Sequence, residues 1–364
     1  MNTHIERLRA LGQSLWLDNI TRAMLDDGTL ARYIAELSIT GLTSNPTIFE
    51  KAIGAGTAYD ARIAELARAG SSGEDLFFAL AVDDLARAAD LFRPIHLATA
   101  GVDGWVSLEV SPLLVDDTRK TIEVAANLHA QAARPNLFIK IPGTPAGVDA
   151  IEASIFAGVP INVTLLFSRE QYLAVAEAYL RGIERRIAAG LDPKVESVAS
   201  IFVSRWDTAV KDQVRPPSQN KLGIAVAHRV YRAYRELLGS ERMGRLRRAG
   251  AHPQRLLWAS TGTKDPAAPD TLYVEALAAP DTIDTMPDKT LQAFADHGRA
   301  SAPMALGQPE HELVIADIAS QGVDIAALAT RLQKEGGESF AKSWSDLLAG
   351  LRDKTARLAQ ARAA

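Results

Sequence analysis

Lys140 is the residue whose surroundings point most clearly to chemistry, because it interrupts an otherwise apolar run, NLFIKIPG. Side chains alternate along a strand, so Lys140 would share the inward face with Phe138 while the apolar residues between and beside them face outward. An isolated ammonium in an apolar interior is costly, and desolvation favours the neutral amine. A neutral lysine amine attacks carbonyl groups and forms Schiff bases. A lysine paired structurally with a carboxylate is the alternative interpretation.

Two carboxylates, Asp18 and Glu109, are the natural partners of such an amine. Asp18 ends the run SLWLD, where alternation groups it with Trp16, and Glu109 lies in WVSLEV, where it is grouped with Ser107. Because they belong to two different predicted strands, they can flank a reacting carbon as acid and base. Two solvated carboxylates at loop edges are the alternative.

Polar side chains recur at the same place in most of the other predicted strands, at or near the carboxyl end and on the inward face. One such residue would be unremarkable, because buried polar groups with a partner are common. Together with Lys140, Asp18 and Glu109 the set is spread over seven strands, which indicates a site, since α/β barrels carry their active sites at this end. The set comprises Thr43, Asn45, Asn162 with Thr164, Ser200 with Phe202, and Ser260 with Trp258.

A candidate phosphate site lies at two neighbouring strand ends. Arg205, Ser260 and Lys264 offer a guanidinium, a hydroxyl and an ammonium there, where barrels usually form their phosphate-binding loops. Residues 205–255 contain twelve Lys or Arg against four Asp or Glu, an excess that could steer anionic substrates. Much of this charge also has the spacing of a solvated helix face, which is the alternative interpretation.

Eight short β-rich runs recur about every 38 residues, separated by stretches with helical periodicity. This spacing suits a strand, a helix and two loops, and it predicts a (β/α)8 TIM barrel. A doubly wound open sheet is the alternative, but no Gly-rich nucleotide loop follows the first run. The predicted strands are residues 14–18, 39–42, 105–110, 136–141, 161–166, 198–203, 255–259 and 282–285.

The remaining segments are expected to form helices around the barrel. The long gap between the second and third runs is predicted to hold two or three helices, including residues 60–70 and 76–92. Residues 312–323 and 339–360 are predicted to be helices that pack on the barrel. We therefore expect one domain over residues 1–364, with the barrel core at about 14–295 and a C-terminal helical extension at about 296–364.

The composition excludes several classes of protein. Of the 364 residues, 47% are hydrophobic and 23% are charged, so wholesale disorder is excluded. A formal net charge of -4 gives no overall basic field that would attract nucleic acid or anionic lipid. The chain has no cysteine, and its seven histidines lack the spacing of a zinc site, so we expect no metal. No run predicts a membrane span or a secretory signal, so a cytoplasmic location is expected.

At these residues the sequence resembles transaldolase in its longer bacterial form. The motifs that carry the resemblance are SLWLDNITR, ITGLTSNPTIFEKAI, VSLEVSPLL, NLFIKIPGTPAG, INVTLLFS, ASIFVSRWD and LWASTGTKDP. The resemblance implies transfer of a dihydroxyacetone unit from sedoheptulose 7-phosphate or fructose 6-phosphate to glyceraldehyde 3-phosphate or erythrose 4-phosphate. This is a step of the non-oxidative pentose phosphate pathway. It implies no cofactor, sugar-phosphate substrates as the only partners, and a monomer or homodimer.

The resemblance also implies roles for individual residues. Lys140 would form the Schiff base, Asp18 would act as acid and base at the C4 hydroxyl, and Glu109 would move protons through a water. Where the shorter transaldolases have an arginine two residues after Ser260, this chain has Gly262. Lys264 is our hypothesis for the missing cation. The donor pocket would be shaped by Thr43, Asn45, Asn162, Thr164, Ser200 and Phe202, and phosphate would be bound by Arg205 and Ser260.

Two other functions stay open. A fructose 6-phosphate aldolase would release dihydroxyacetone to water, but this chain is much longer than that type and contains Glu109. A non-catalytic barrel that binds sugar phosphates or a partner protein would not need an amine between two carboxylates.

Overall fold

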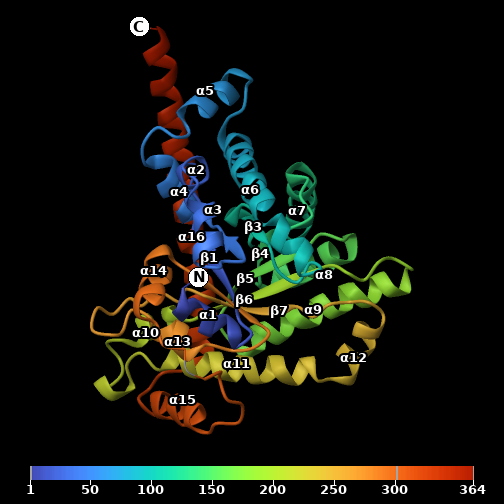
Figure 1. Cartoon of the computed structure of the whole chain (residues 1–364), viewed down its shortest axis with the longest axis vertical. Coiled ribbons are helices and arrows are strands. Elements are labelled where there is room, and N and C mark those ends of the chain that lie inside the picture. Colours follow the sequence, from blue (N-terminus) through green and yellow to red (C-terminus); the bar gives the residue numbers. More distant parts are fainter. Residues whose placement is uncertain (1, 301, 364) are drawn as a thin grey trace.

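The computed structural model describes residues 2–300 and 302–363, and eight parallel strands form the predicted barrel with helices around it (Figure 1). The strands follow the order β2-β1-β8-β7-β6-β5-β4-β3. Three predicted strands match residue by residue, and the other five are displaced or differ in length by one or two residues. The strands are β1 (Ser14–Asp18), β2 (Gly41–Thr43), β3 (Val106–Glu109), β4 (Leu137–Pro142), β5 (Ile161–Leu166), β6 (Ser197–Phe202), β7 (Arg255–Ala259) and β8 (Thr282–Met286).

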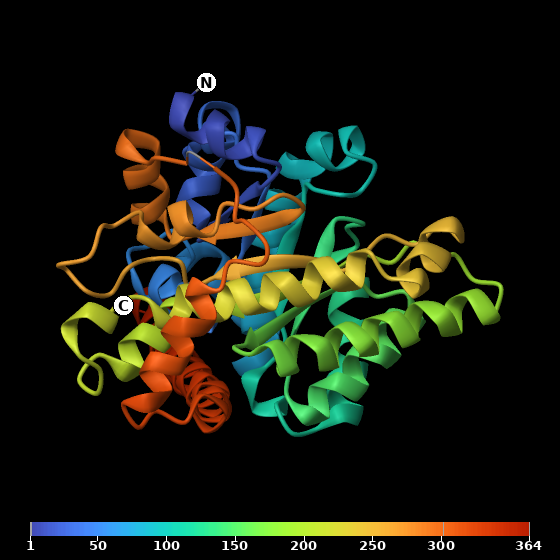
Figure 2. The same cartoon turned by 90° about the horizontal axis from the view of Figure 1, so that it is seen from below.

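Helices cover the outside of the barrel, and α9 and α11 lie lengthwise along it in the view from below (Figure 2). The gap between β2 and β3 holds three helices, as predicted, and helices follow β8. The helices are α1 (Thr3–Ala10), α2 (Arg22–Asp26), α3 (Thr29–Glu36), α4 (Pro46–Gly54), α5 (Asp60–Arg68), α6 (Gly73–Ala98), α7 (Thr118–Ala132), α8 (Pro145–Ala157), α9 (Arg169–Ala188), α10 (Ser204–Val210), α11 (Leu222–Leu238), α12 (Glu241–Arg248), α13 (Leu272–Ala276), α14 (Asp288–His297), α15 (Glu310–Ser320) and α16 (Ile325–Ala363), with 3-10 turns η1 (Pro112–Leu114) and η2 (Pro216–Ser218).

The barrel closes between β2 and β3 through a short contact. Gly41 bridges Trp105, and the Leu42 N–H donates to the Trp105 carbonyl at 2.9 Å. A Cβ at position 41 would lie 2.6 Å from that carbonyl and 2.6 Å from the Trp16 ring. Glycine is therefore required here, because any side chain would hold the two strands apart.

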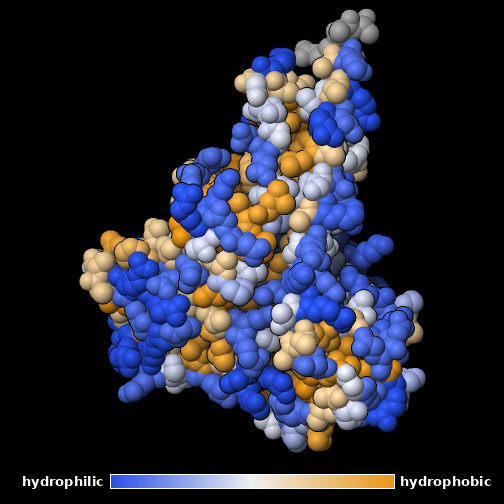
Figure 3. Space-filling model, turned by 180° about the vertical axis from the view of Figure 1, so that it is seen from behind, coloured by the Kyte–Doolittle hydropathy of each residue, from blue (hydrophilic) through white to orange (hydrophobic). Residues whose placement is uncertain are grey.

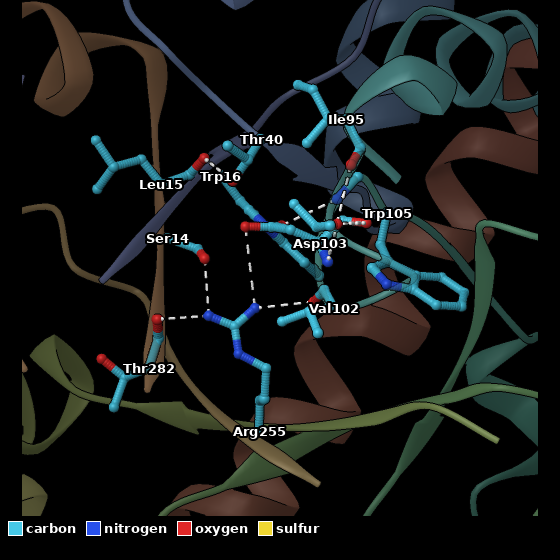
Figure 4. A network of polar contacts seen from close by, with 12 residues as sticks. Ser14, Leu15, Trp16, Thr40, Ile95, Val102, Asp103, Trp105, Arg255 and Thr282 are labelled. Carbon is cyan, nitrogen blue, oxygen red and sulfur yellow. Dashed lines mark hydrogen bonds and ion pairs between the residues drawn. The ribbon is translucent and has the colours of Figure 1, made fainter. Parts of the chain in front are cut away.

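Arg255 closes the N-terminal end of the barrel (Figure 4). Its Nη2 donates to Ser14 Oγ at 2.7 Å and to the Thr282 carbonyl at 3.0 Å, and its Nη1 donates to the Val102 carbonyl at 3.1 Å. One guanidinium thus joins β1, β7, β8 and the turn before β3.

Above Arg255 the barrel interior is filled by aromatic side chains. Asp103, 3.9 Å from Arg255, accepts a hydrogen bond from Trp16 Nε1 at 2.8 Å. The Phe138 ring stacks on Trp105 at 4.0 Å and lies 6.3 Å from the Trp16 ring. Phe138 and Trp16 therefore point inward, as predicted, and they form the floor beneath the carboxyl ends of their strands.

The prediction that Trp258 points inward was wrong. In the strand register Leu257 lies opposite Ser200, whereas Trp258 lies opposite Ile201 and Asp284. Ser200 faces the interior, so Leu257 does as well and Trp258 faces outward. Directly after β7 the backbone of Ser260 adopts a left-handed conformation, with φ 56°. Simple alternation fails at this point.

Asp284 is a buried carboxyl on the outward face of β8. Thr261 Oγ1 donates to its Oδ1 at 2.9 Å, whereas its Oδ2 has no hydrogen-bond partner among the described residues. Burial raises the pKa of Asp284 to about 7, and the Thr261 hydrogen bond opposes this only partly. The protonated form is therefore favoured in the folded protein.

We expect Asp284→Asn to remove a pH-dependent loss of stability. A folded-state pKa above the ordinary value of 3.8 stabilises the native protein at low pH, and this contribution is lost as pH rises through about 7. Between about pH 5 and pH 8 the free energy of unfolding of the variant should rise by roughly 2–3 kcal/mol relative to that of the native protein. Urea unfolding at several pH values measures this. The exposed Asp116→Asn is the control, and a difference constant with pH for Asp284→Asn would contradict the expectation.

α16 starts at the barrel and runs to the C-terminus, where it projects from the body beside α4 and α5 (Figure 1). It packs against α4, α5, α6 and β5. Lys354 joins the projecting part of α16 to the end of α4 and the start of α5. Its Nζ donates to the carbonyls of Ile53 and Gly56 and lies 2.8 Å from Asp60 Oδ1. The predicted C-terminal helices on the barrel are confirmed.

The face seen from behind carries hydrophilic side chains over most of its area, with apolar residues in patches between them (Figure 3). No single helix within residues 2–300 and 302–363 is long and apolar enough to cross a membrane. Taken together, α15 and α16 pass that test only as a pair bent by 87°.

Candidate active site

A cavity of about 100 Å³ lies at the carboxyl end of the barrel, where the polar residues were predicted to gather. It brings together residues that are far apart in the sequence and come from β1, β2, β4, β6, β7, β8, the loops that follow strands, and helices α10 and α16. Its lining is Asp18, Thr43, Asn45, Lys140, Ser200, Phe202, Arg205, Ala259, Ser260, Thr285 and Phe340.

Lys140 lies at the base of this cavity and is 4% exposed. In the strand register it lies opposite Glu109 on β3 and Asn162 on β5. Its Nζ is 3.1 Å from Glu109 Oε2 and donates to the Ser44 carbonyl at 3.2 Å. The amine therefore contacts a carboxylate directly and lies at the end of a strand, as its position in the sequence predicts.

The two carboxyl groups near Lys140, those of Asp18 and Glu109, both have a raised pKa. Burial raises the pKa of Glu109, an effect that the charge of Lys140 opposes and that of Asp18 reinforces. Burial also raises the pKa of Asp18, opposed by Lys140 and by the hydrogen bond from Thr43. Carboxyls held in this way exchange protons closer to neutral pH than ordinary ones, which suits acid–base chemistry.

Asp18 is oriented by hydroxyl groups from the neighbouring strands. Thr43 Oγ1 donates to Asp18 Oδ1 at 2.7 Å and lies 2.7 Å from Thr285 Oγ1. Asn45 caps the N-terminus of α4, where its Oδ1 accepts from the Ile48 N–H at 3.1 Å. The Asn45 amide nitrogen is therefore the part of this side chain that can donate to a ligand.

A chain of hydrogen bonds runs beside Lys140. Ser200 Oγ donates to Asn162 Oδ1 at 2.7 Å, and Asn162 Nδ2 donates to Ser107 Oγ at 3.0 Å. Thr164, two residues further along β5, is fully buried, and its hydroxyl has no partner among the described residues. Glu109, Asn162 and Thr164 are buried around the cavity rather than in its lining.

Arg205 places a guanidinium in the cavity wall without a carboxylate partner within 4 Å in the described part of the chain. It lies 5.3 Å from the centre of the Phe202 ring and 5.9 Å from that of Phe340. Beside it, Ser260 Oγ lies 2.8 Å from Ser204 Oγ. A guanidinium that lacks a counterion and lies next to hydroxyl groups is a natural site for a phosphate.

Comparison with known proteins connects this geometry to a family. The profile described as transaldolase/fructose-6-phosphate aldolase matches residues 15–351. The chain belongs to this family. Curated relatives named transaldolase include those of Renibacterium salmoninarum (43% identical over 97% of both chains), Thermobifida fusca (44%, over 96% of this chain and 97% of the relative) and Neisseria gonorrhoeae (41%, over 96% and 99%).

Gly262 lies close to two side chains that follow β8. A Cβ at this position would lie 3.1 Å from Thr290 Oγ1 and 3.4 Å from Pro287 Cγ. A larger residue would need Thr290 to shift by a few tenths of an ångström, whereas its contact with Pro287 would be ordinary. Lys264 is exposed on the following loop and is not in the cavity lining, although its charge lowers the pKa of Asp18.

Three residues of the cavity, Ala259, Thr285 and Phe340, were not predicted from the sequence. Ala259 was missed because Trp258 was expected on the inward face of the same strand. Thr285 could have been found, because alternation within residues 282–285 places it on the inward face together with Ile283. Phe340 had no such signal, since it belongs to α16 and reaches the cavity only through the packing of that helix on the barrel. Among the residues that the structure describes, no three His, Asp or Glu side chains converge as metal ligands would.

Proposed function

We propose that the protein is a transaldolase that transfers a dihydroxyacetone unit between sugar phosphates through a Schiff base on Lys140. The observation that carries the proposal is the amine of Lys140, which lies 3.1 Å from Glu109 in a cavity shared with Asp18 and Arg205. The donors are sedoheptulose 7-phosphate and fructose 6-phosphate, and the acceptors are glyceraldehyde 3-phosphate and erythrose 4-phosphate.

The first half-reaction starts at Lys140. Glu109 takes a proton from Nζ, and the neutral amine attacks the C2 carbonyl of the donor, with loss of water, to form a protonated imine. Asp18 removes the proton of the C4 hydroxyl, the C3–C4 bond breaks, and its electrons move into the imine. The aldose product leaves, and a three-carbon enamine stays on Lys140.

The second half-reaction runs in reverse with a different aldehyde. The enamine carbon attacks the acceptor, Asp18 returns a proton to the new hydroxyl, and water releases the ketose. The imine withdraws the electrons, so the proposed reaction requires neither a metal nor an organic cofactor. Asn45 and Asn162 hold the enamine, and Thr43, Thr164, Ser200 and Phe202 shape the donor pocket.

Arg205 and Ser260 bind the substrate phosphate in this proposal. The guanidinium can grip phosphate oxygens bidentately, and the Ser260 hydroxyl can donate to a third. We propose that the protein is a monomer or a homodimer. We place the reaction in the cytoplasm with its sugar-phosphate substrates and propose no nucleic-acid or membrane partner.

An assay with and without an acceptor tests the proposed function. With fructose 6-phosphate and erythrose 4-phosphate, we expect sedoheptulose 7-phosphate and glyceraldehyde 3-phosphate in equal amounts and ping-pong kinetics. Free dihydroxyacetone formed at the same rate without an acceptor would instead identify a fructose 6-phosphate aldolase. No turnover and no Schiff base with any of these sugars would favour a non-catalytic sugar-phosphate-binding barrel.

Lys264→Ala tests whether this lysine supplies the positive charge that an arginine at the position of Gly262 would provide. We expect KM for the sugar phosphates to rise several-fold with little change in kcat, because the charge would act on phosphate binding in ground state and transition state alike. Lys120→Ala, an exposed lysine on α7, is the matched control. An unchanged KM in Lys264→Ala would remove Lys264 from the site and leave Arg205 as its cation.

A further inference from the structure

α16 reaches the cavity through one side chain, Phe340, which is 5% exposed. The helix is held against the barrel next to this residue. Gln333 Nε2 donates to the carbonyls of Gly143 and Leu165, both at 3.0 Å. One turn beyond Phe340, Trp344 Nε1 donates to Glu74 Oε1 at 2.9 Å. Phe340 lies between these two attachment points.

The backbone of α16 comes unusually close to the site at Gly336, one turn before Phe340. A Cβ at position 336 would lie 2.8 Å from Leu165 Cδ2 and 3.3 Å from Arg205 Nη1. Glycine inside a helix costs about 1 kcal/mol relative to alanine, so its presence here is explained by the close approach. The helix is therefore fitted to the cavity wall rather than passing over it at a distance.

The ring of Phe340 lies between the two cations of the cavity. Its centre is 5.7 Å from Lys140 Nζ and 5.9 Å from Arg205 Cζ, within the range of cation–π contacts. A ketose phosphate joined to Lys140 at C2 and held at its phosphate by Arg205 must extend between these groups. Its carbon chain therefore runs along the Phe340 ring.

The ring is also part of the wall of a small cavity. Its volume of about 100 Å³ is small compared with the roughly 300–1,000 Å³ of ordinary small-ligand pockets. A cavity of this size holds only a few water molecules. A side chain that borders both Lys140 and the path of the substrate chain limits how much water reaches the bound intermediate.

Access of water matters because the enamine has two fates. Its carbon can attack an acceptor aldehyde, which forms a carbon–carbon bond. Alternatively it takes a proton from water or from Asp18, after which water adds to C2, the C–N bond breaks, and dihydroxyacetone leaves with the Lys140 amine restored. The first fate is transfer and the second is release of dihydroxyacetone. Both end with water adding to C2 of an imine on Lys140, so they differ in whether the enamine carbon reacts with an aldehyde or takes a proton.

We propose that Phe340 is a reaction-specificity residue that shields the Lys140 enamine from water and so directs it to an aldehyde acceptor. This inference rests on the proposed transaldolase function. It assigns to the C-terminal helix a part in the outcome of the reaction, while Schiff-base formation depends on Lys140 and its carboxylates.

The test is the ratio of free dihydroxyacetone to sedoheptulose 7-phosphate formed from fructose 6-phosphate and erythrose 4-phosphate. We expect this ratio to rise at least tenfold in Phe340→Ala and less in Phe340→Leu, which keeps most of the apolar volume and serves if the alanine variant does not fold. Borohydride should still trap an adduct on Lys140 in both variants.

Leu347→Ala is the matched control, because Leu347 is buried on the same helix but is not in the cavity lining. It should lower stability and leave the ratio unchanged. An unchanged ratio in a folded Phe340 variant that still forms the adduct would overturn the inference. So would an equal rise in Leu347→Ala, since helix docking would then be responsible. If the native protein formed no adduct, the proposed function itself would fail.

Discussion

Lys140→Met is expected to lower the rate of transfer by about 10⁴-fold or more, the size of loss seen when an enzyme loses its nucleophile. Methionine has a similar length and can fill the same space, but it cannot form an imine. The decisive measurement is mass spectrometry after incubation with fructose 6-phosphate and borohydride. The native protein should gain one reduced three-carbon unit on the peptide that contains Lys140, and the variant should gain none.

A second variant separates chemistry from stability. Removing one member of a buried ion pair is destabilising, because the remaining charge loses its partner. Lys140→Met combined with Glu109→Gln removes both charges, so it should recover stability without recovering transfer. If instead the single Lys140→Met variant folded and kept its activity and its adduct, the Schiff base would have to lie elsewhere, and Lys140 would be only the structural partner of Glu109.

Asp18→Asn should lower kcat by about 10²- to 10⁴-fold, the usual contribution of a positioned general base. Asparagine can still accept the hydrogen bond from Thr43, so the cavity should keep its shape. Imine formation does not require removal of the C4 hydroxyl proton, whereas cleavage of the C3–C4 bond does. Borohydride should therefore trap the intact six-carbon sugar phosphate on Lys140 rather than the three-carbon unit.

This change in the mass of the adduct is a readout that a purely structural role for Asp18 would not produce. Asp116→Asn, an exposed carboxylate outside the cavity, should leave the rate and the adduct unchanged. A three-carbon adduct in Asp18→Asn, formed at the native rate, would mean that another group removes the proton.

The barrel could be predicted because each strand carries its own signal in the alternation of buried side chains. β1, β5 and β7 were predicted with their observed bounds, whereas β2 was expected at residues 39–42 and occupies Gly41–Thr43. Within the described residues this strand pairs along its length with β1, and on its other side it forms a single bridge to Trp105, the residue before β3. Its bounds depend on partners that are distant in the sequence, so a local pattern could not define them.

The alternation of side chains along the strands also predicted many of the site residues. Lys140, Asp18 and Ser200 lie on regular strands, where the identity of one inward residue determines that of the next. The same rule failed at Ser260, because the backbone leaves the strand with a left-handed conformation and Trp258 faces outward. Ser260 was placed in the cavity correctly but for the wrong reason.

The sequence alone thus determined the barrel, the inward lysine and the two carboxylates at its carboxyl end, because strand periodicity and side-chain chemistry are local properties. Only the tertiary structure decided the 3.1 Å contact between Lys140 and Glu109, the exposed position of Lys264 and the place of Phe340 in the cavity. These depend on strand register, on the path of a loop and on the docking of a helix that follows the barrel. Each of them joins residues across the fold, and no local pattern encodes such a distance.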